Sequence, residues 1–234
     1  MTPHPDKAPV SLRRILLRVV LFVAIFAALL FLPAGTLAWP GAWVFLATLA
    51  TVSIGGMTWL AGHDPGLLKE RMRPPFQRGQ PPWDRALMIL LVPFWFGWYA
   101  LMGFDRRFGW SSVPPWLQVL GAILLGLGIY VSWRTLMANS YAAPVVRVQK
   151  ERGHKVASTG PYAYVRHPMY ASVILFALGV PLLLGSWWGL LVSPLLVLAL
   201  AVRAVFEERM LKAELAGYAD YAERVRYRFV PLVW

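Results

Sequence analysis

Six long apolar runs constrain this chain more than any other feature of its sequence. A helix needs about 20 apolar residues to cross the hydrocarbon core of a bilayer, and several runs approach that length. The chain is 58% hydrophobic and 15% charged, whereas a soluble domain is about a quarter charged. We therefore predict an all-α fold, a polytopic transmembrane bundle of about six helices. The runs lie near residues 15–32, 42–61, 86–103, 116–137, 169–184 and 187–205.

The basic residues are distributed unevenly between the two sides of this predicted bundle. With the N-terminus in the cytoplasm, all but Arg106 and Arg107 of the 23 Lys and Arg residues fall on the inner side. Because cytoplasmic loops of membrane proteins are enriched in Lys and Arg, we predict that both termini are cytoplasmic. The net charge of +12 then reflects orientation and attraction to anionic membrane lipids, and nucleic acid is not an expected partner. We expect an integral protein of a bacterial inner (cytoplasmic) membrane.

The N-terminus and the loops complete this organisation. The segment "MTPHPDKAPVSLRRILLR" has no small-residue cleavage site, so we expect a retained first helix rather than a signal peptide. Residues 1–115 predict N-terminal transmembrane scaffold helices. In the second half, the connection over residues 138–168 is long for a compact membrane protein, and long connections often have a function. Residues 206–234 predict a helix that leaves the membrane and lies near the interface.

Two further patterns bear on ligands. The chain has no Cys, and its four His (4, 63, 154 and 167) show no HExxH spacing, so we predict no metal site. The run "GAILLGLGIY" carries Gly121, Gly126 and Gly128, and small residues of this kind admit a close helix neighbour. A nucleotide-binding glycine loop is the alternative, but the run lacks the preceding strand and the full GxGxxG pattern.

The segment "STGPYAYVRHPMY" (158–170) concentrates polar and aromatic groups at the start of an apolar run. Pro168 suits the first position of a helix, where free N–H groups favour an anionic ligand. Arg166 offers a planar fork for a carboxylate, and the Tyr side chains offer flat walls with polar tips. A basic, aromatic membrane edge is the structural alternative for each residue alone.

The second cluster is the pair Glu207 and Glu208, just past the last apolar run. Two carboxylates at a membrane boundary are costly unless they are paired, solvated or functional. One interpretation pairs Glu208 with Lys212 and Glu207 with Arg203, each at a spacing of four residues on a helix. The other gives at least one carboxylate to a cationic ligand. Together the clusters suit S-adenosylmethionine (SAM), which carries a carboxylate, an ammonium, a sulfonium and an adenine.

These pieces resemble the isoprenylcysteine carboxyl methyltransferase family of integral membrane enzymes, and more loosely the phospholipid N-methyltransferases. The matching segments are "GPYAYVRHPMY", "EERML" and "GYADYAERVRYRFVP", in that order. The resemblance implies a methyltransferase-like membrane core over 116–234, with a cytosolic loop and tail helix, that binds SAM as cofactor. It also maps Tyr218, Tyr221 and Val225 onto a family segment. The family's C-terminal ending maps onto Arg228 and Pro231, with Arg226 as the alternative to Arg228. A GxG element of the phospholipid methyltransferases maps onto Gly126 and Gly128.

From the residues and the resemblance we predict a SAM-dependent methyltransferase. It would act on a carboxylate or amine of a lipid-like or prenylated acceptor that enters from the bilayer. An NADPH-dependent reductase of the sterol-reductase type and a non-catalytic membrane protein are the alternatives. The predicted catalytic residues are Asn139, Arg203, Glu207 and Arg228. The predicted cofactor-binding residues are Gly160, Tyr162, Arg166, His167, Pro168, Tyr170, Glu207, Glu208, Leu211 and Tyr221.

Overall fold

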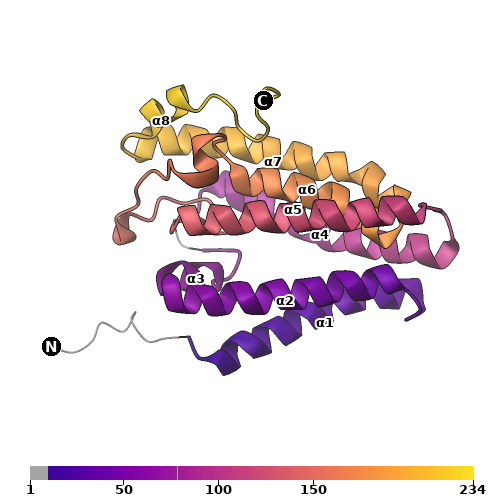
Figure 1. The fold of residues 1–234 in the computed structure, drawn as a ribbon. Helices are drawn as coiled ribbons and strands as arrows, with labels where there is room; N and C mark the ends of the chain where they lie inside the picture. The colour runs from indigo at the N-terminus through magenta and orange to yellow at the C-terminus, as the bar shows by residue number, and fades with distance from the viewer. Residues whose placement is uncertain (1–9, 78) are drawn as a thin grey trace.

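The computed structural model describes residues 10–77 and 79–234 and folds them into helices (Figure 1). His4, Lys7 and Arg78, and with them the predicted cytoplasmic N-terminus, lie outside the described residues. Two short 3₁₀ turns cover Lys150–Arg152 and Gly160–Ala163. The α-helices are α1 (Leu12–Ala34), α2 (Pro40–His63), α3 (Pro65–Arg71), α4 (Pro82–Phe108), α5 (Pro115–Ala138), α6 (Pro168–Leu184), α7 (Trp187–Glu214) and α8 (Tyr218–Arg224).

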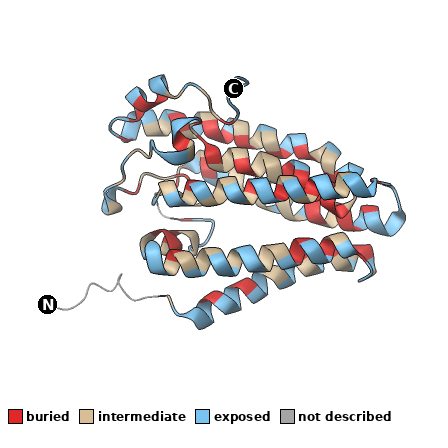
Figure 2. Cartoon of the chain, in the orientation of Figure 1, coloured by how far each residue is buried: buried red, intermediate tan, exposed pale blue. Residues whose placement is uncertain are grey.

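Length and polarity make this bundle an integral membrane fold. Helices α1, α2, α4, α5 and α7 are each long and apolar enough to cross a membrane, and α6 is a shorter apolar helix. Large apolar side chains such as Leu17, Leu90 and Leu191 are 68–70% exposed. Figure 2 shows exposed positions, in pale blue, along the membrane-length helices. In water such exposure would be costly, whereas lipid chains solvate it. The predicted all-α, polytopic transmembrane bundle is confirmed.

The break between α6 and α7 falls at "LLLGSWWG", between the predicted apolar runs 169–184 and 187–205. Gly185 ends α6 with a φ of +77°, a left-handed conformation that glycine adopts without strain. Ser186 then caps α7, because its hydroxyl accepts a hydrogen bond from the backbone N–H of Gly189. The chain therefore reverses within two residues, and α6 and α7 lie side by side.

Helices α5 and α6 cross closely at small residues. A Cβ on Gly121 would meet the backbone of α6, and a Cβ on Gly179 would lie 2.7 Å from the backbone nitrogen of Leu125. Gly128 is similarly close to Phe176. The predicted close packing is confirmed for Gly121 and Gly128, but it is wrong for Gly126, which faces open space. The α5–α6 pair brings the loop after α5 over the start of α6.

The helices run up and down, so the loops divide between two ends of the bundle. One end, called here the site end, holds the start of α1, α3, the loop from α5 to α6, and α8 (Figure 1). The far end holds the short turns from α1 to α2, α4 to α5 and α6 to α7 (Figure 1). Helix α1 packs against α2 and α4, and α7 packs against α4 and α6. The polar clusters predicted from the sequence meet at the site end.

Candidate functional site

Three segments that are distant in the sequence are joined at the site end. The backbone N–H of Arg166 donates to the carbonyl of Tyr227 at 2.9 Å, and that of His167 donates to the carbonyl of Arg228 at 2.9 Å. Val165 and Tyr227 form an isolated parallel bridge. The tail after α8 is thereby fixed against the segment that leads into α6. The end of α7 lies beside both, because Glu208 bonds to each of them.

The Glu208 carboxylate holds this junction together. It accepts from the guanidinium Nε of Arg166 at 2.7 Å, from Nε of Arg228 at 3.2 Å, and pairs with Nε2 of His167 at 3.1 Å. The residue is 4% exposed, and a buried charge needs such partners. Its expected alternative partner, Lys212, is not among them. The pairing therefore crosses between elements and does not run along α7.

Arg166 uses its planar fork inside the protein. Its Nη2 donates to the second oxygen of Glu208 at 3.3 Å, so the contact with that carboxylate is bidentate. Its Nη1 donates to backbone carbonyls of the tail, the shortest being that of Val225 at 2.9 Å. The carboxylate that the Arg166 guanidinium binds is therefore that of Glu208 and not that of a ligand. The geometry makes Arg166 a residue that positions the tail and α7.

Glu207 lies in a different environment from its neighbour. One of its oxygens accepts from the hydroxyl of Tyr170 at 2.6 Å, and the same oxygen is 3.9 Å from Nδ1 of His167. Its side chain is 22% exposed, and its other oxygen has no hydrogen-bond partner among the described residues. Arg203 does not pair with it, contrary to the structural interpretation of the sequence. Of the two carboxylates, Glu207 is the one with capacity left for a ligand.

Arg203 is held instead by a residue of the first half of the chain. Its Nε donates to Asp84 at 2.8 Å, and its Nη2 donates to the carbonyl of Pro144 at 2.9 Å. Asp84 is fully buried and also accepts from Gln80 at 2.6 Å. The Arg203 guanidinium carbon lies 5.9 Å from the ring centre of Tyr170. Sequence reasoning missed Asp84, and its only signal was an acid at the start of an apolar run.

Tyr162 and Asn139 connect the loop to the tail. The Asn139 amide donates to the hydroxyl of Tyr162 at 2.8 Å, and the hydroxyl of Tyr221 donates to the carbonyl of Tyr162 at 2.8 Å. Burial raises the pKa of the Tyr162 phenol, and the hydrogen bond from Asn139 counteracts this. Glu207 raises the same pKa and Arg71 lowers it, so both charges lie near this ring. These contacts place Asn139, Tyr162 and Tyr221 in one cluster with the edge of the Glu207 site.

The remaining predicted residues support this cluster through packing. Gly160 has a φ of +59°, and a Cβ there would lie 3.2 Å from that of Ala138. Pro168 is buried at the first position of α6, and Leu211 packs with Tyr162 and Tyr221. Arg228 lies with its guanidinium carbon 4.7 Å from the ring centre of Trp234. Its rival Arg226 is exposed, with its carbonyl accepting from Arg166 at 3.2 Å.

One buried hydroxyl beside the cluster has no partner. The Tyr218 side chain is buried, yet its hydroxyl makes no hydrogen bond within residues 10–77 and 79–234. Burial raises the pKa of this phenol, and Glu208 and Glu207 raise it further. A buried polar group without a partner costs about 1–3 kcal/mol. A ligand with a polar group at this position would remove that cost.

No group of three His, Asp or Glu side chains suited to a metal occurs in the described residues.

The fold and this cluster define a class: a helical integral membrane protein with a buried polar junction at one end. Within that class, the resemblance to the membrane methyltransferases is confirmed, because residues 116–216 match the model of the phospholipid methyltransferase family. The chain is also similar to curated proteins named protein-S-isoprenylcysteine O-methyltransferase. It is 26% identical to that of Dictyostelium discoideum over 54% of this chain and 50% of the relative. It is 32% identical to that of Saccharomyces cerevisiae over 34% of each chain.

A solved structure shares the fold across nearly the whole chain. The structure is described as the eukaryotic intramembrane Ras methyltransferase ICMT, isoprenylcysteine carboxyl methyltransferase. It aligns with a TM-score of 0.52 at 17% identity, covering 92% of this chain and 75% of that one. The chain spans about half the length of the curated relatives from Dictyostelium discoideum and Schizosaccharomyces pombe. The likeness to the solved structure extends the shared fold beyond residues 116–216, which the family model matches, into the first half of the chain.

Proposed function

We propose that this protein is an integral membrane methyltransferase that moves a methyl group from SAM to a lipid-like or prenylated acceptor. The observation that carries the proposal is the unequal use of the two adjacent carboxylates. Glu208 is bonded to the guanidiniums of Arg166 and Arg228 and to the ring of His167, whereas Glu207 keeps one oxygen without a partner in the described chain. The relatives named as isoprenylcysteine O-methyltransferases support the same activity.

The groups that lack partners fit the polar end of SAM. Its ammonium needs an acceptor such as the spare oxygen of Glu207, and its carboxylate needs a donor such as the orphaned hydroxyl of Tyr218. SAM supplies an electrophilic methyl group on a sulfonium. The protein's own residues then bind and orient. Tyr170 fixes the direction of the Glu207 carboxylate by donating to it at 2.6 Å, and the Glu208 junction fixes the tail.

The proposal also covers the organisation of the chain. Residues 116–234 would form the methyltransferase core, and residues 1–115 would supply scaffold helices, although Asp84 reaches into the core from the first part. We place the site end in the cytoplasm of a bacterial inner membrane, because the segments at that end carry nearly all the Lys and Arg residues of the described chain.

A reductase is the second candidate, and the geometry disfavours it. NADPH carries phosphates and would need basic side chains with free donors. Arg166 and Arg228 both donate to Glu208 instead. The test is calorimetric titration of the detergent-purified protein with SAM and, separately, with NADPH. We expect saturable binding of SAM and none of NADPH. Binding of NADPH alone would contradict the proposal.

A further inference from the structure

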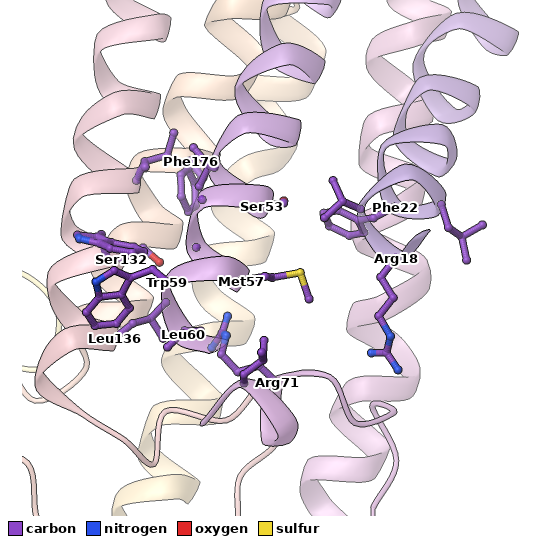
Figure 3. Close-up of a pocket in the computed structure, with 18 of the residues that line it drawn as sticks. Arg18, Phe22, Ser53, Met57, Trp59, Leu60, Arg71, Ser132, Leu136 and Phe176 are labelled. Carbon is purple, nitrogen blue, oxygen red and sulfur yellow. The ribbon is translucent and has the colours of Figure 1, made fainter. Parts of the chain in front are cut away.

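Arginines at the site end are not all held in the same way. Arg18 and Arg71 lie at one end of an apolar groove between α1, α2 and α5, and no acidic side chain lines this groove in the described part of the protein (Figure 3). Each donates to a backbone carbonyl, at 2.6 Å for Arg18 and at 2.8 Å for Arg71. Arg203 also donates to a carbonyl, but its guanidinium is paired in addition with the buried carboxylate of Asp84. Arg203 therefore has a partner that the arginines of the groove do without.

A neighbouring acid distinguishes Arg203 from the arginines of the groove. Arg203 and Glu207 are four residues apart on α7, the spacing at which oppositely charged side chains of a helix meet. Arg18 and Arg71 have no acidic residue three or four positions away. Arg203 is 7% exposed, and a buried charge needs a partner of opposite sign. Two carboxylates, those of Asp84 and Glu207, therefore compete for the guanidinium of Arg203.

The carboxylate of Asp84 is fixed on both of its oxygens. Oδ1 accepts from Nε of Arg203 at 2.8 Å. Oδ2 accepts from the side-chain amide of Gln80 at 2.6 Å and from the backbone N–H of Val146 at 3.2 Å. These donors come from α7, from the segment before α4 and from the loop after α5, and Asp84 itself is fully buried. Asp84 is thus an immobile acceptor that holds the guanidinium of Arg203 against the start of α4.

Tyr170 links the held guanidinium to Glu207 without an ion pair. The centre of its ring lies 5.9 Å from the guanidinium carbon of Arg203, a distance at which a cation is attracted to an aromatic face. Its hydroxyl donates to one oxygen of Glu207 at 2.6 Å. That oxygen of Glu207 therefore has a neutral donor. The other oxygen stays free for a ligand only as long as Arg203 remains on Asp84.

We propose that Asp84 is a positioning residue of the candidate site, which keeps Arg203 from pairing with Glu207. The proposal rests on the proposed function, because it assigns the spare oxygen of Glu207 to the ammonium of SAM. When the charge of Asp84 is removed, the guanidinium of Arg203 turns along α7 and occupies that oxygen. Glu207 then carries an ion pair in place of the ligand. Asp84, a residue of the first half of the chain, thus controls the cofactor site without touching the cofactor.

The first test asks whether removing the arginine repairs the loss of the aspartate. Asp84→Asn keeps the size of the side chain but loses its charge and one of its two acceptor oxygens. We expect calorimetric titration of the detergent-purified variant to show a loss of SAM affinity of about tenfold, the effect of one charge-assisted hydrogen bond. Adding Arg203→Gln to this variant should restore the affinity, because no cation is left to pair with Glu207. A double variant that binds SAM no better than Asp84→Asn would overturn the proposal.

The matched control is Asp105→Asn, because Asp105 is another buried acid of α4 but lies at the far end. We expect native SAM affinity in this variant, and a loss equal to that of Asp84→Asn would mean general damage to α4 and would overturn the proposal. The double variant Asp84→Asn and Arg203→Gln carries no unpaired buried charge at this position, so it remains informative if Asp84→Asn alone does not fold. Weak SAM binding by the folded double variant would then count against the proposal.

The second test needs no ligand and so separates this proposal from the proposed function. A double-mutant cycle of Arg203→Gln and Glu207→Gln, read as shifts of the thermal unfolding midpoint, measures the coupling between the two side chains. We expect little coupling in the native protein and a clear stabilising coupling in the Asp84→Asn background, where the new ion pair forms. Equal coupling in both backgrounds would overturn the proposal. A native protein that does not bind SAM would remove the proposed function, and the cycle would still decide where Arg203 pairs.

Discussion

The two ends of the bundle both bury carboxylates, but they satisfy them in different ways. At the far end Asp105 accepts from the hydroxyls of Ser111 at 2.6 Å and Ser186 at 2.5 Å, which ties α4 to the turn between α6 and α7. At the site end Asp84 and Glu208 accept from guanidiniums that come from other elements. Both donors are neutral and reach the same oxygen of Asp105, and its other oxygen is buried without a partner among the described residues. The site end instead gathers charge, and it leaves the oxygen of one further acid, Glu207, for a ligand.

The largest expected effect comes from Glu208→Gln. The substitution leaves the guanidiniums of Arg166 and Arg228 without the charge that balances them, and breaking a buried ion pair costs about 3–5 kcal/mol. We expect a clear fall in the midpoint of thermal unfolding in detergent, together with loss of SAM binding. A variant with native stability would show that the contrast between the two ends is not one of charge.

Glu207→Gln should affect the ligand rather than the fold. If its spare oxygen holds the ammonium of SAM, neutralising it should weaken binding by about 1.5–3 kcal/mol, a tenfold to hundredfold loss. The stability should change by no more than about 0.5 kcal/mol, because the side chain is partly exposed. Calorimetric SAM titration and thermal unfolding of the same preparation measure both. Native affinity in this variant would remove the main support for the cofactor site.

The stability loss expected for Asp105→Asn is smaller than the stability loss of Glu208→Gln and smaller than the loss of SAM binding in Glu207→Gln. Asparagine keeps an oxygen that can accept from both serine hydroxyls, but these hydrogen bonds then lack a charged acceptor. The expected loss of stability is therefore about 1 kcal/mol, the typical difference between a charged and a neutral hydrogen bond. SAM affinity should stay at the native value because the far end lies across the bundle from the site. A loss of SAM binding with intact folding would instead show that the two ends of the bundle are coupled.

The smallest expected effect is a loss of stability at acidic pH. Among the described residues, only the site end contains histidines whose protonation could cause it. His63, His154 and His167, the histidines of the described chain, all lie at that end. Burial, with the charges of Arg152 and Arg147, lowers the pKa of His154 to about 4. Its folded pKa lies below the ordinary value of about 6.5, so its contribution to stability is present above pH 6.5 and is lost as the pH falls towards 4. His154→Asn should reduce this loss, measured as unfolding midpoints between pH 7 and 4.

The sequence predicted the helices, and the segments that meet at the site end, better than the pairings among their side chains. Apolar runs and the "LLLGSWWG" break located the helices, because lipid exposure imposes composition and Gly185 imposes a turn. The adjacent acids Glu207 and Glu208 were recognised together, but their different environments depend on elements far away in the chain. Asp84 was missed for the same reason, since it meets Arg203 across 119 positions. A local pattern cannot report a partner that only the packing of α4 against α7 supplies.

The shortness of α6 has a consequence for the lipid around the protein. Its 17 residues reach about 25 Å at 1.5 Å per residue, less than the hydrocarbon thickness of about 30 Å. The helix begins at Pro168, directly after His167 and Arg166. These two residues therefore lie closer to the hydrocarbon region than they would before a longer helix. Around a short segment a bilayer thins locally, and its headgroups sink with it. We therefore expect a thinner bilayer beside α6, with its headgroups closer to the His167 and Arg166 junction than a full-length helix would allow.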